Sequence, residues 1–151
     1  MKMFLGGIAI SLGLLAAPAY SAEKGTANEA MAMVKKAVAL IKSDGKEKAF
    51  AAISDPNNKD FHDRDLYIYV YDLNGVAVAH GVNQKLVGKN LLDMKDNEGK
   101  AMIQEMVKVA KEKGSGWVDF KWPNPVSKVV EAKSGYVEKA GDVLVGSGIY
   151  K

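Results

Sequence analysis

DLYIYVYDLNGVAVAH, residues 65–80, is the stretch of sequence that decides the fold. Its first arm alternates aromatic with aliphatic residues, so the two faces of one strand carry different kinds of side chain. The aromatic set is Tyr67, Tyr69 and Tyr71, and the aliphatic set is Leu66, Ile68 and Val70. The turn Asp72-Leu73-Asn74-Gly75 places Asn-Gly where a tight reversal needs positive φ, so residues 76–80 return beside the first arm. Both faces are apolar, which predicts a hairpin at the centre of a sheet.

The length and composition allow one domain with a hydrophobic core. The chain has 151 residues, of which 48% are hydrophobic. Its start is typical of a secretory signal peptide, because Lys2 precedes an apolar run at residues 4–17 and small residues follow it. That run is shorter than the roughly 20 residues of a membrane-spanning helix. We therefore predict a signal peptide at residues 1–22, with cleavage after Ala19, Ser21 or Ala22, and a folded domain at residues 23–151.

Charge and cysteine content exclude several classes of function. The net charge is +3, and lysines alternate with acidic residues instead of gathering in a basic block, which argues against nucleic-acid binding. The chain has no cysteine, so disulfides, thiolate catalysis, iron–sulfur clusters and covalently attached haem are excluded. Together with the signal peptide, this composition favours the bacterial periplasm. We expect no cofactor.

The order of predicted elements indicates an α+β fold. A capping box at Thr26 begins a long helix, and a shorter helix follows over residues 46–54. After the hairpin, residues 81–99 fold back over a sheet face, a helix covers residues 99–113, and three strands follow. We expect these strands at residues 117–122, at 126–139 with an interruption near 132–135, and at 143–150. Short turns between strands imply an antiparallel sheet of five or six strands, the plan of PAS-like sensor folds, with a helical crossover above a pocket.

Five segments together resemble a single Cache domain of bacterial extracytoplasmic sensors. They are YVYDLNGVAVAHG, VGKNLLDMKD, GSGWVDFKWPNP, KSGYV and the ending DVLVGSGIYK. The resemblance covers roughly residues 26–151. It implies a binding domain for small molecules, often short monocarboxylates such as acetate, propionate, lactate or pyruvate, with the pocket between the sheet and the crossover. Cache domains usually lie between two membrane helices of a chemoreceptor or histidine kinase, whereas we expect this chain to be a freestanding secreted form. A membrane receptor or histidine kinase is therefore the expected partner.

A small carboxylate needs one cation, one or two directional donors and apolar walls. Lys133 is the candidate cation. The alternative is an ordinary solvated lysine at the end of a strand, which the sequence does not distinguish from a ligand-binding one. Tyr136 is a candidate hydrogen-bond donor. The alternative is a tyrosine of the sheet whose ring packs in the core and whose hydroxyl contacts solvent. His80 either donates at the pocket mouth or caps loop carbonyls. The expected walls are Tyr69, Phe120 and Trp122.

Residue spacing supports the choice of Trp122 over the other tryptophan. Trp117 and Trp122 are five residues apart and should face opposite sides of a regular strand, whereas Phe120 shares the face of Trp122. Trp117 is therefore expected under the long helix. Gly146 and Gly148 leave one face of the last strand bare, which fits close contact with a ligand or, slightly better, with a helix.

Metal binding and catalysis have little support in the sequence. The acidic residues near 62–65 and 93–98 lack EF-hand spacing, and the chain has two histidines. No nucleophile elbow, paired-carboxylate motif or phosphate-binding loop is present, so we do not expect an enzyme. The sequence predicts a domain that binds a small organic anion reversibly and serves signal transduction. The alternative is a protein-interaction module of the same fold whose pocket is filled by its own side chains.

Overall fold

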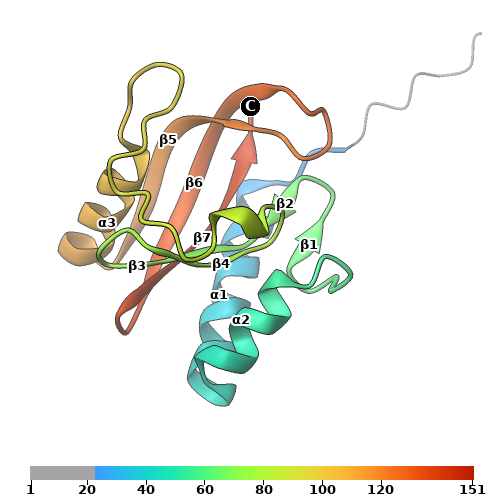
Figure 1. Cartoon of the computed structure of the whole chain (residues 1–151). Coiled ribbons are helices and arrows are strands. Elements are labelled where there is room, and N and C mark those ends of the chain that lie inside the picture. The colour runs from blue at the N-terminus through green and yellow to red at the C-terminus, as the bar shows by residue number, and fades with distance from the viewer. Residues whose placement is uncertain (1–22) are drawn as a thin grey trace, which may run out of the picture.

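A computed structural model describes residues 23–151 as an α+β domain, in which helices lie against both faces of an antiparallel sheet (Figure 1). The predicted signal peptide, residues 1–22, lies outside the described residues. The helices are α1 (Ala27–Asp44), α2 (Lys46–Ser54), the 3-10 helix η1 (Gln84–Leu86) and α3 (Met102–Lys113). The strands are β1 (His62–Asp63), β2 (Leu66–Tyr67), β3 (Tyr69–Asp72), β4 (Ala77–His80), β5 (Ser115–Pro123), β6 (Val130–Ala140) and β7 (Val143–Tyr150).

Helix α1 begins and ends where its sequence provides caps. The Thr26 side chain accepts the N–H of Glu29, and the Glu29 carboxylate accepts the N–H of Thr26, which completes the predicted capping box. Gly45 ends the helix with φ +86°, a conformation that glycine adopts without steric cost. Helix α2 starts directly after this glycine, so the two helices pack side by side on one face of the sheet (Figure 1).

The sheet has the strand order β4-β3-β7-β6-β5, with every pair antiparallel. The predicted α+β plan with an antiparallel sheet is therefore confirmed. The hairpin at residues 65–80 also forms, but its expected place at the centre of the sheet is wrong. Strand β4 is an edge, and β7 lies in the centre. The edge is covered by the crossover segment (residues 81–101), whose Gly88 N–H bonds the Ala77 carbonyl at 2.8 Å.

Three local predictions differ from the structure. Strand β6 runs without the expected interruption, because Gly135 pairs with Val118 on one side and Gly148 on the other. Strand β1, between α2 and the hairpin, was not predicted from the sequence and forms a small two-stranded sheet with β2. Helix α3 starts at Met102, three residues later than expected.

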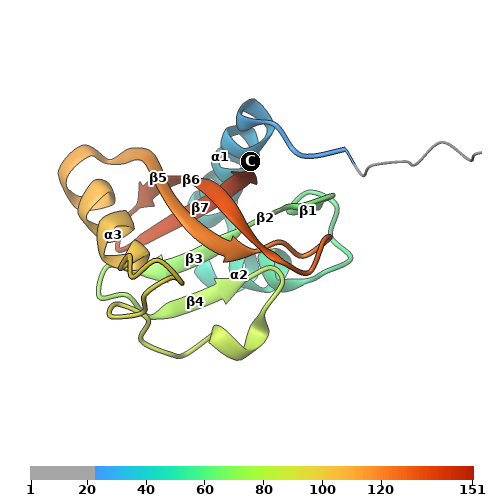
Figure 2. The same ribbon diagram turned by 90° about the horizontal axis from the view of Figure 1, so that it is seen from above.

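The sheet separates two hydrophobic cores. Its aliphatic face carries Leu66, Ile68 and Val70 and lies against α1 and α2. Its opposite face, the aromatic face, carries Tyr67, Tyr69 and Tyr71 and lies beneath α3 and the crossover segment (Figure 2). The predicted division between aromatic and aliphatic side chains is confirmed.

The two glycines of β7 lie on the aromatic face. A Cβ at Gly146 would overlap the Tyr69 ring, and one at Gly148 would lie 2.8 Å from the Lys133 Cε atom. The slight preference for helix contact was wrong, since these glycines make room for Tyr69 and Lys133 and not for a helix. Because β7 has glycines at these two positions, large side chains of the neighbouring strands can lie across its backbone.

We predict that Gly146→Ala destabilises the domain. The added methyl group must displace the Tyr69 ring, and overpacking of this kind costs about 1–3 kcal/mol of unfolding free energy. The matched control is Ser147→Ala on the opposite face, because the buried Ser147 hydroxyl has no hydrogen-bond partner within residues 23–151. Urea unfolding should show a loss for Gly146→Ala and no loss for Ser147→Ala. Equal effects of the two substitutions would contradict this account of the strand.

Candidate functional site

A small cavity lies on the aromatic face of the sheet, beneath α3. Its volume is about 10 Å³, close to the room that one water molecule needs. Strands β2 to β6 and helix α3 form its walls. The lining residues are Tyr67, Tyr69, Tyr71, His80, Met102, Ile103, Met106, Phe120, Trp122 and Lys133. Five of the six site residues predicted from the sequence are therefore gathered around one enclosed space.

Lys133 places a cation inside this cavity wall. Its side chain is 1% exposed, although it lies on a strand whose ends reach the surface. The ammonium donates to the Tyr67 hydroxyl at 2.9 Å and to the Tyr150 hydroxyl at 3.3 Å. It also lies 4.2 Å from the centre of the Tyr67 ring and 4.7 Å from that of Tyr150. The aromatic rings thus replace part of the hydration that the charge loses on burial.

Burial sets the protonation behaviour of this lysine. Desolvation disfavours the charged form and lowers the pKa of Lys133 to about 7, while the more distant Asp65 acts in the opposite direction. Among the described residues no carboxylate forms an ion pair with Lys133. The Asp65 side chain instead accepts the N–H of Gly25 at 2.8 Å. A buried cation without an anionic partner is costly for the fold, which favours a role in binding.

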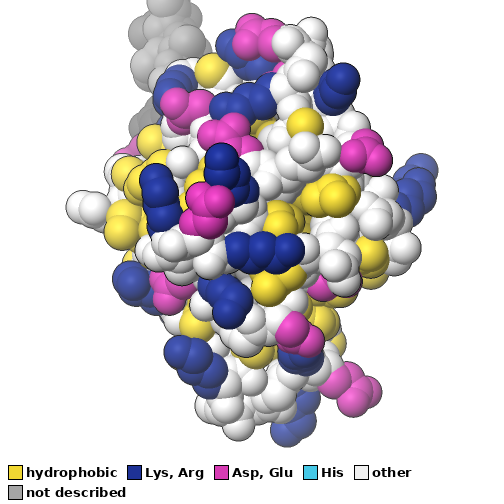
Figure 3. All heavy atoms as spheres, turned by 90° about the vertical axis from the view of Figure 1, so that its left-hand side faces the viewer, with side chains coloured by type: hydrophobic (Ala, Val, Ile, Leu, Met, Phe, Trp, Pro, Cys, Tyr) yellow, Lys and Arg dark blue, Asp and Glu magenta, His cyan; other side chains and the backbone are white. Residues whose placement is uncertain are grey.

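The surface near α3 gives a contrast. There the Lys and Arg side chains lie among Asp and Glu side chains (Figure 3). Lys100, for example, pairs with Glu105 at 3.1 Å. Lys100 therefore has a counter-charge and partial contact with solvent, whereas Lys133 has neither within residues 23–151.

His80 contributes a neutral imidazole to the cavity wall. Its Nδ1 atom accepts hydrogen bonds from the N–H groups of Asn83, at 3.0 Å, and Val82, at 3.3 Å. A neutral imidazole that accepts at Nδ1 carries its proton on Nε2. Burial, together with the nearby Lys133, lowers the pKa of His80 to about 3, so the ring is neutral at physiological pH. The sequence left open whether His80 donates or caps a loop; its Nδ1 holds two loop N–H groups, and its ring also lines the cavity.

Tyr69 adds a second unused donor. Its hydroxyl is buried and has no hydrogen-bond partner within the part of the chain that the structure describes. Lys133 has three N–H donors and uses two. The cavity wall therefore offers more donors than acceptors, together with a cation. Such a wall suits a small ligand that accepts hydrogen bonds and carries negative charge.

Tyr136 does not belong to this cavity, which corrects the prediction for that residue. Lys133 and Tyr136 are three positions apart on one continuous strand, so their side chains face opposite sides of the sheet. The Tyr136 ring packs in the aliphatic core, and its hydroxyl donates to Glu138 at 2.9 Å. Trp117 lies beside the Tyr136 ring with a centroid distance of 5.4 Å. Trp117 is 40% exposed, and therefore is not buried under α1 as expected.

Sequence reasoning missed several residues that form the cavity. Met102, Ile103 and Met106 of α3 were not singled out as site residues, because helical spacing alone does not tell a core residue from a pocket wall. Tyr67 was detectable, since it alternates with Tyr69 on the same face. Tyr150 was not singled out, because its contact with Lys133 depends on the pairing of β6 with β7.

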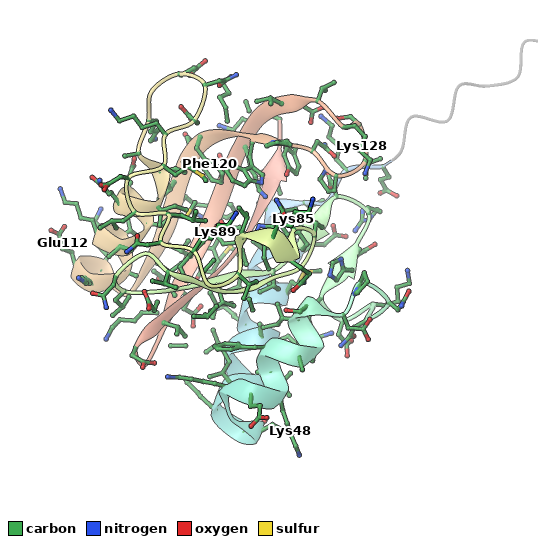
Figure 4. All side chains as sticks on the ribbon, in the orientation of Figure 1. Lys48, Lys85, Lys89, Glu112, Phe120 and Lys128 are labelled. Carbon is green, nitrogen blue, oxygen red and sulfur yellow. The ribbon has the colours of Figure 1, made fainter. Side chains whose placement is uncertain are left out.

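An open groove of about 540 Å³ adjoins the cavity, and Trp122 lines both. The groove runs between the crossover segment, the end of α2 and the turn between β5 and β6. Figure 4 shows Lys85 on the crossover segment and Lys128 at that turn. Trp122 is thus part of the wall of both the cavity and the groove.

The described residues also limit other kinds of site. No group of three or more His, Asp or Glu side chains within residues 23–151 could hold a metal ion. In the same residues no helix combines the length and hydropathy needed to cross a bilayer.

We predict that the free energy of unfolding rises with pH between about pH 7 and pH 9. The lowered pKa of Lys133 means that the folded protein binds fewer protons than the unfolded chain in this window, so raising the pH favours the fold. The slope should approach 1.4 kcal/mol per pH unit. Urea unfolding at several pH values should show this rise in the wild type and its loss in Lys133→Met. A parallel rise in both proteins would assign it to other groups.

Comparison with known proteins places this geometry in a family. The sequence matches the profile of the family described as single Cache domain 2 over residues 19–151. It is 33% identical over 91 residues to the methyl-accepting chemotaxis protein McpP of Pseudomonas putida, a match that covers 59% of this chain and 17% of McpP. It is 32% identical over 89 residues to the sensor histidine kinase MctS of Rhizobium johnstonii, covering 58% and 19%. The match therefore spans less than a fifth of either relative.

The fold agrees with this relationship. A solved Cache chemosensory domain, described as the structural basis for carboxylic acid recognition, superimposes with a TM-score of 0.69 and 27% identity. The alignment covers 82% of this chain and 91% of that chain. Because the family profile matches most of the sequence and the fold is shared with a solved Cache domain, this chain belongs to the single Cache domain 2 family.

Proposed function

We propose that this domain binds a small organic anion, a short monocarboxylate, reversibly in the cavity at Lys133. The observation that carries the proposal is the buried Lys133 ammonium, which lies in a wall of hydrogen-bond donors and has no carboxylate partner among residues 23–151. A carboxylate would supply the missing charge and accept from Lys133, Tyr69 and His80. The carboxylic acid named for the similar Cache domain supports the same class of ligand.

The size of the cavity limits the ligand. About 10 Å³ is too little for acetate, so side chains must move when a ligand binds. Met102 and Met106 are suited to this, since methionine is unbranched and adapts its rotamer at low cost. They lie on one side of the cavity, opposite the sheet, where movement does not disturb strand pairing. Acids of two to four carbons fit this arrangement better than larger ones.

The domain is proposed to act outside the cytoplasm as the sensing part of a signalling system, without catalysis. The predicted signal peptide favours the periplasm. A chemotaxis receptor and a histidine kinase are among its relatives, so a membrane receptor or a histidine kinase is the proposed partner. The alternative is an interaction module that binds no small molecule. The small volume of the cavity favours that alternative, and ligand binding decides between the two.

The first test is a thermal-unfolding screen with acetate, propionate, lactate and pyruvate, using acetamide and ethylamine as controls. A ligand at a hundred times its dissociation constant adds about 2.7 kcal/mol of stability, which shifts the unfolding midpoint by several degrees. We expect stabilisation by carboxylates only. A flat response to all of them would sink the binding proposal and favour the interaction module.

We predict that Lys133→Met abolishes this response while the domain stays folded. Removing one partner of a buried charge pair costs about 2–5 kcal/mol of binding free energy, so affinity should fall at least 30-fold. The matched control is Lys139→Met on the same strand and the same sheet face, where the side chain is exposed. Titration calorimetry should show weak or no binding for Lys133→Met and normal binding for Lys139→Met. Unchanged affinity of Lys133→Met would refute the role of this lysine.

Tyr69→Phe separates binding from folding. The substitution removes a buried hydroxyl that has no partner within residues 23–151, so the unfolding free energy should stay equal or rise. If that hydroxyl donates to the ligand, affinity should fall roughly tenfold, the worth of one hydrogen bond to a charged group. Unfolding and calorimetry on the same preparation check both expectations. A loss of stability without a loss of affinity would make Tyr69 structural only.

A further inference from the structure

Lys133 is a charged group whose protonation state depends on what lies beside it. It has two phenol hydroxyls and four aromatic rings nearby, and within residues 23–151 no carboxylate lies within ion-pair distance. We propose that the cavity takes up its carboxylate together with one proton, which Lys133 binds, so that the affinity of the domain falls as the pH rises. This inference rests on the proposed function and adds a pH dependence to it.

The physical reason is a competition between burial and pairing. In the enclosed cavity, loss of hydration penalises the ammonium, and neutral rings offset only part of that penalty. A bound carboxylate provides the opposite charge at close range and stabilises the ammonium. The pKa of Lys133, about 7 without such a partner, therefore rises when the anion binds. Above pH 7 the lysine of the free domain is largely neutral, and binding must then bring in a proton.

The tyrosines and the histidine that face Lys133 stay neutral in this range. Burial raises the pKa values of the neighbouring tyrosines, so they stay neutral, and burial keeps the His80 ring neutral above about pH 3. Helix α3 contributes apolar side chains to the cavity, and β5 contributes Phe120 and Trp122. Asp65, which precedes β2, acts on Lys133 from a longer range while its side chain bonds the Gly25 N–H. The titratable groups that surround Lys133 or act on its charge are Tyr67, Tyr69, Tyr71, His80, Tyr150 and Asp65.

The linkage predicts the sign and size of the effect. A ligand that raises the pKa of a group binds more tightly when that group is already protonated. With a pKa near 7 in the free domain, the dissociation constant should increase roughly 30-fold between pH 6.0 and pH 8.5. The carboxylate itself is ionised at both pH values, so it does not contribute this dependence.

The test is titration calorimetry of the mature protein with whichever of acetate, propionate, lactate and pyruvate binds most tightly. Each pH is measured in two buffers of different ionisation enthalpy, because proton uptake adds a buffer-dependent heat. We expect uptake of nearly one proton at pH 8.5 and almost none at pH 6.0. Lys139→Met should behave as the wild type. Lys133→Arg, which stays charged, should bind without proton uptake.

The outcomes separate the inference from the proposed function. Binding with the same heat in both buffers and the same affinity at both pH values overturns proton coupling and leaves carboxylate binding intact. If no carboxylate binds at pH 6.0 or at pH 8.5, both the proton coupling and the proposed function are overturned. If Lys133→Arg does not fold, the buffer dependence of the wild type and of Lys139→Met decides the question alone. Proton uptake that persists in a folded Lys133→Arg would assign the proton to another group and overturn the proposal.

Discussion

The burial of the Lys133 ammonium on the aromatic face of the sheet is the constraint to which the rest of the structure conforms. A charge removed from water needs partners, and this one has phenol hydroxyls and ring faces. The central strand provides room on this face, because Gly146 lies against the Tyr69 ring and Gly148 lies against the Lys133 side chain and the Ser134 carbonyl. The placement of one lysine thus connects the composition of β7, the tyrosines of the hairpin and the enclosed cavity.

The two faces of the sheet have different physical roles. The aliphatic face packs against α1 and α2 in a core of Ala, Val and Ile side chains, which gives stability without specific chemistry. The aromatic face combines tyrosines, a cation and the methionines of α3 around a space that is almost filled. On this face the buried Tyr69 hydroxyl has no hydrogen-bond partner within residues 23–151, and the methionines of α3 can adapt their rotamers. A rigid layer therefore supports an adaptable one.

His80 connects the cavity to the surface. Its ring lines the cavity, its Nδ1 holds the N–H groups of the next loop, and its carbonyl accepts the Gln84 side chain at 2.6 Å. The Gln84 side chain also bonds the Ser54 carbonyl at the end of α2. His80 is thus bonded to the crossover segment and, through Gln84, to the end of α2. These hydrogen bonds form a continuous path from the cavity wall to the end of α2.

Local sequence determined much of this protein. Alternation at residues 66–71 assigned aromatic and aliphatic side chains to opposite faces, and Asn-Gly set the turn, because both depend on backbone geometry within a few residues. The same rule put Phe120 and Trp122 on one face. The alternation rule also places Lys133 and Tyr136 on opposite faces of a continuous strand. The sequence prediction did not use this, because it expected an interruption of the strand near residues 132–135. The family resemblance predicted a pocket, and the alternation of side chains along the strands predicted most of the residues that line it.

Tertiary structure alone decided how these pieces meet. The position of the hairpin at the sheet edge depends on β7 pairing with β3 and β6, contacts between residues more than seventy positions apart in the first case. The burial of Lys133, its contact with Tyr150 and the role of α3 as a cavity wall follow from that pairing. A lysine in a sequence carries no sign of its desolvation, because the surrounding atoms come from distant strands. Sequence therefore determined which side chains share a face, and only the packing of the strands determined which of them lost water.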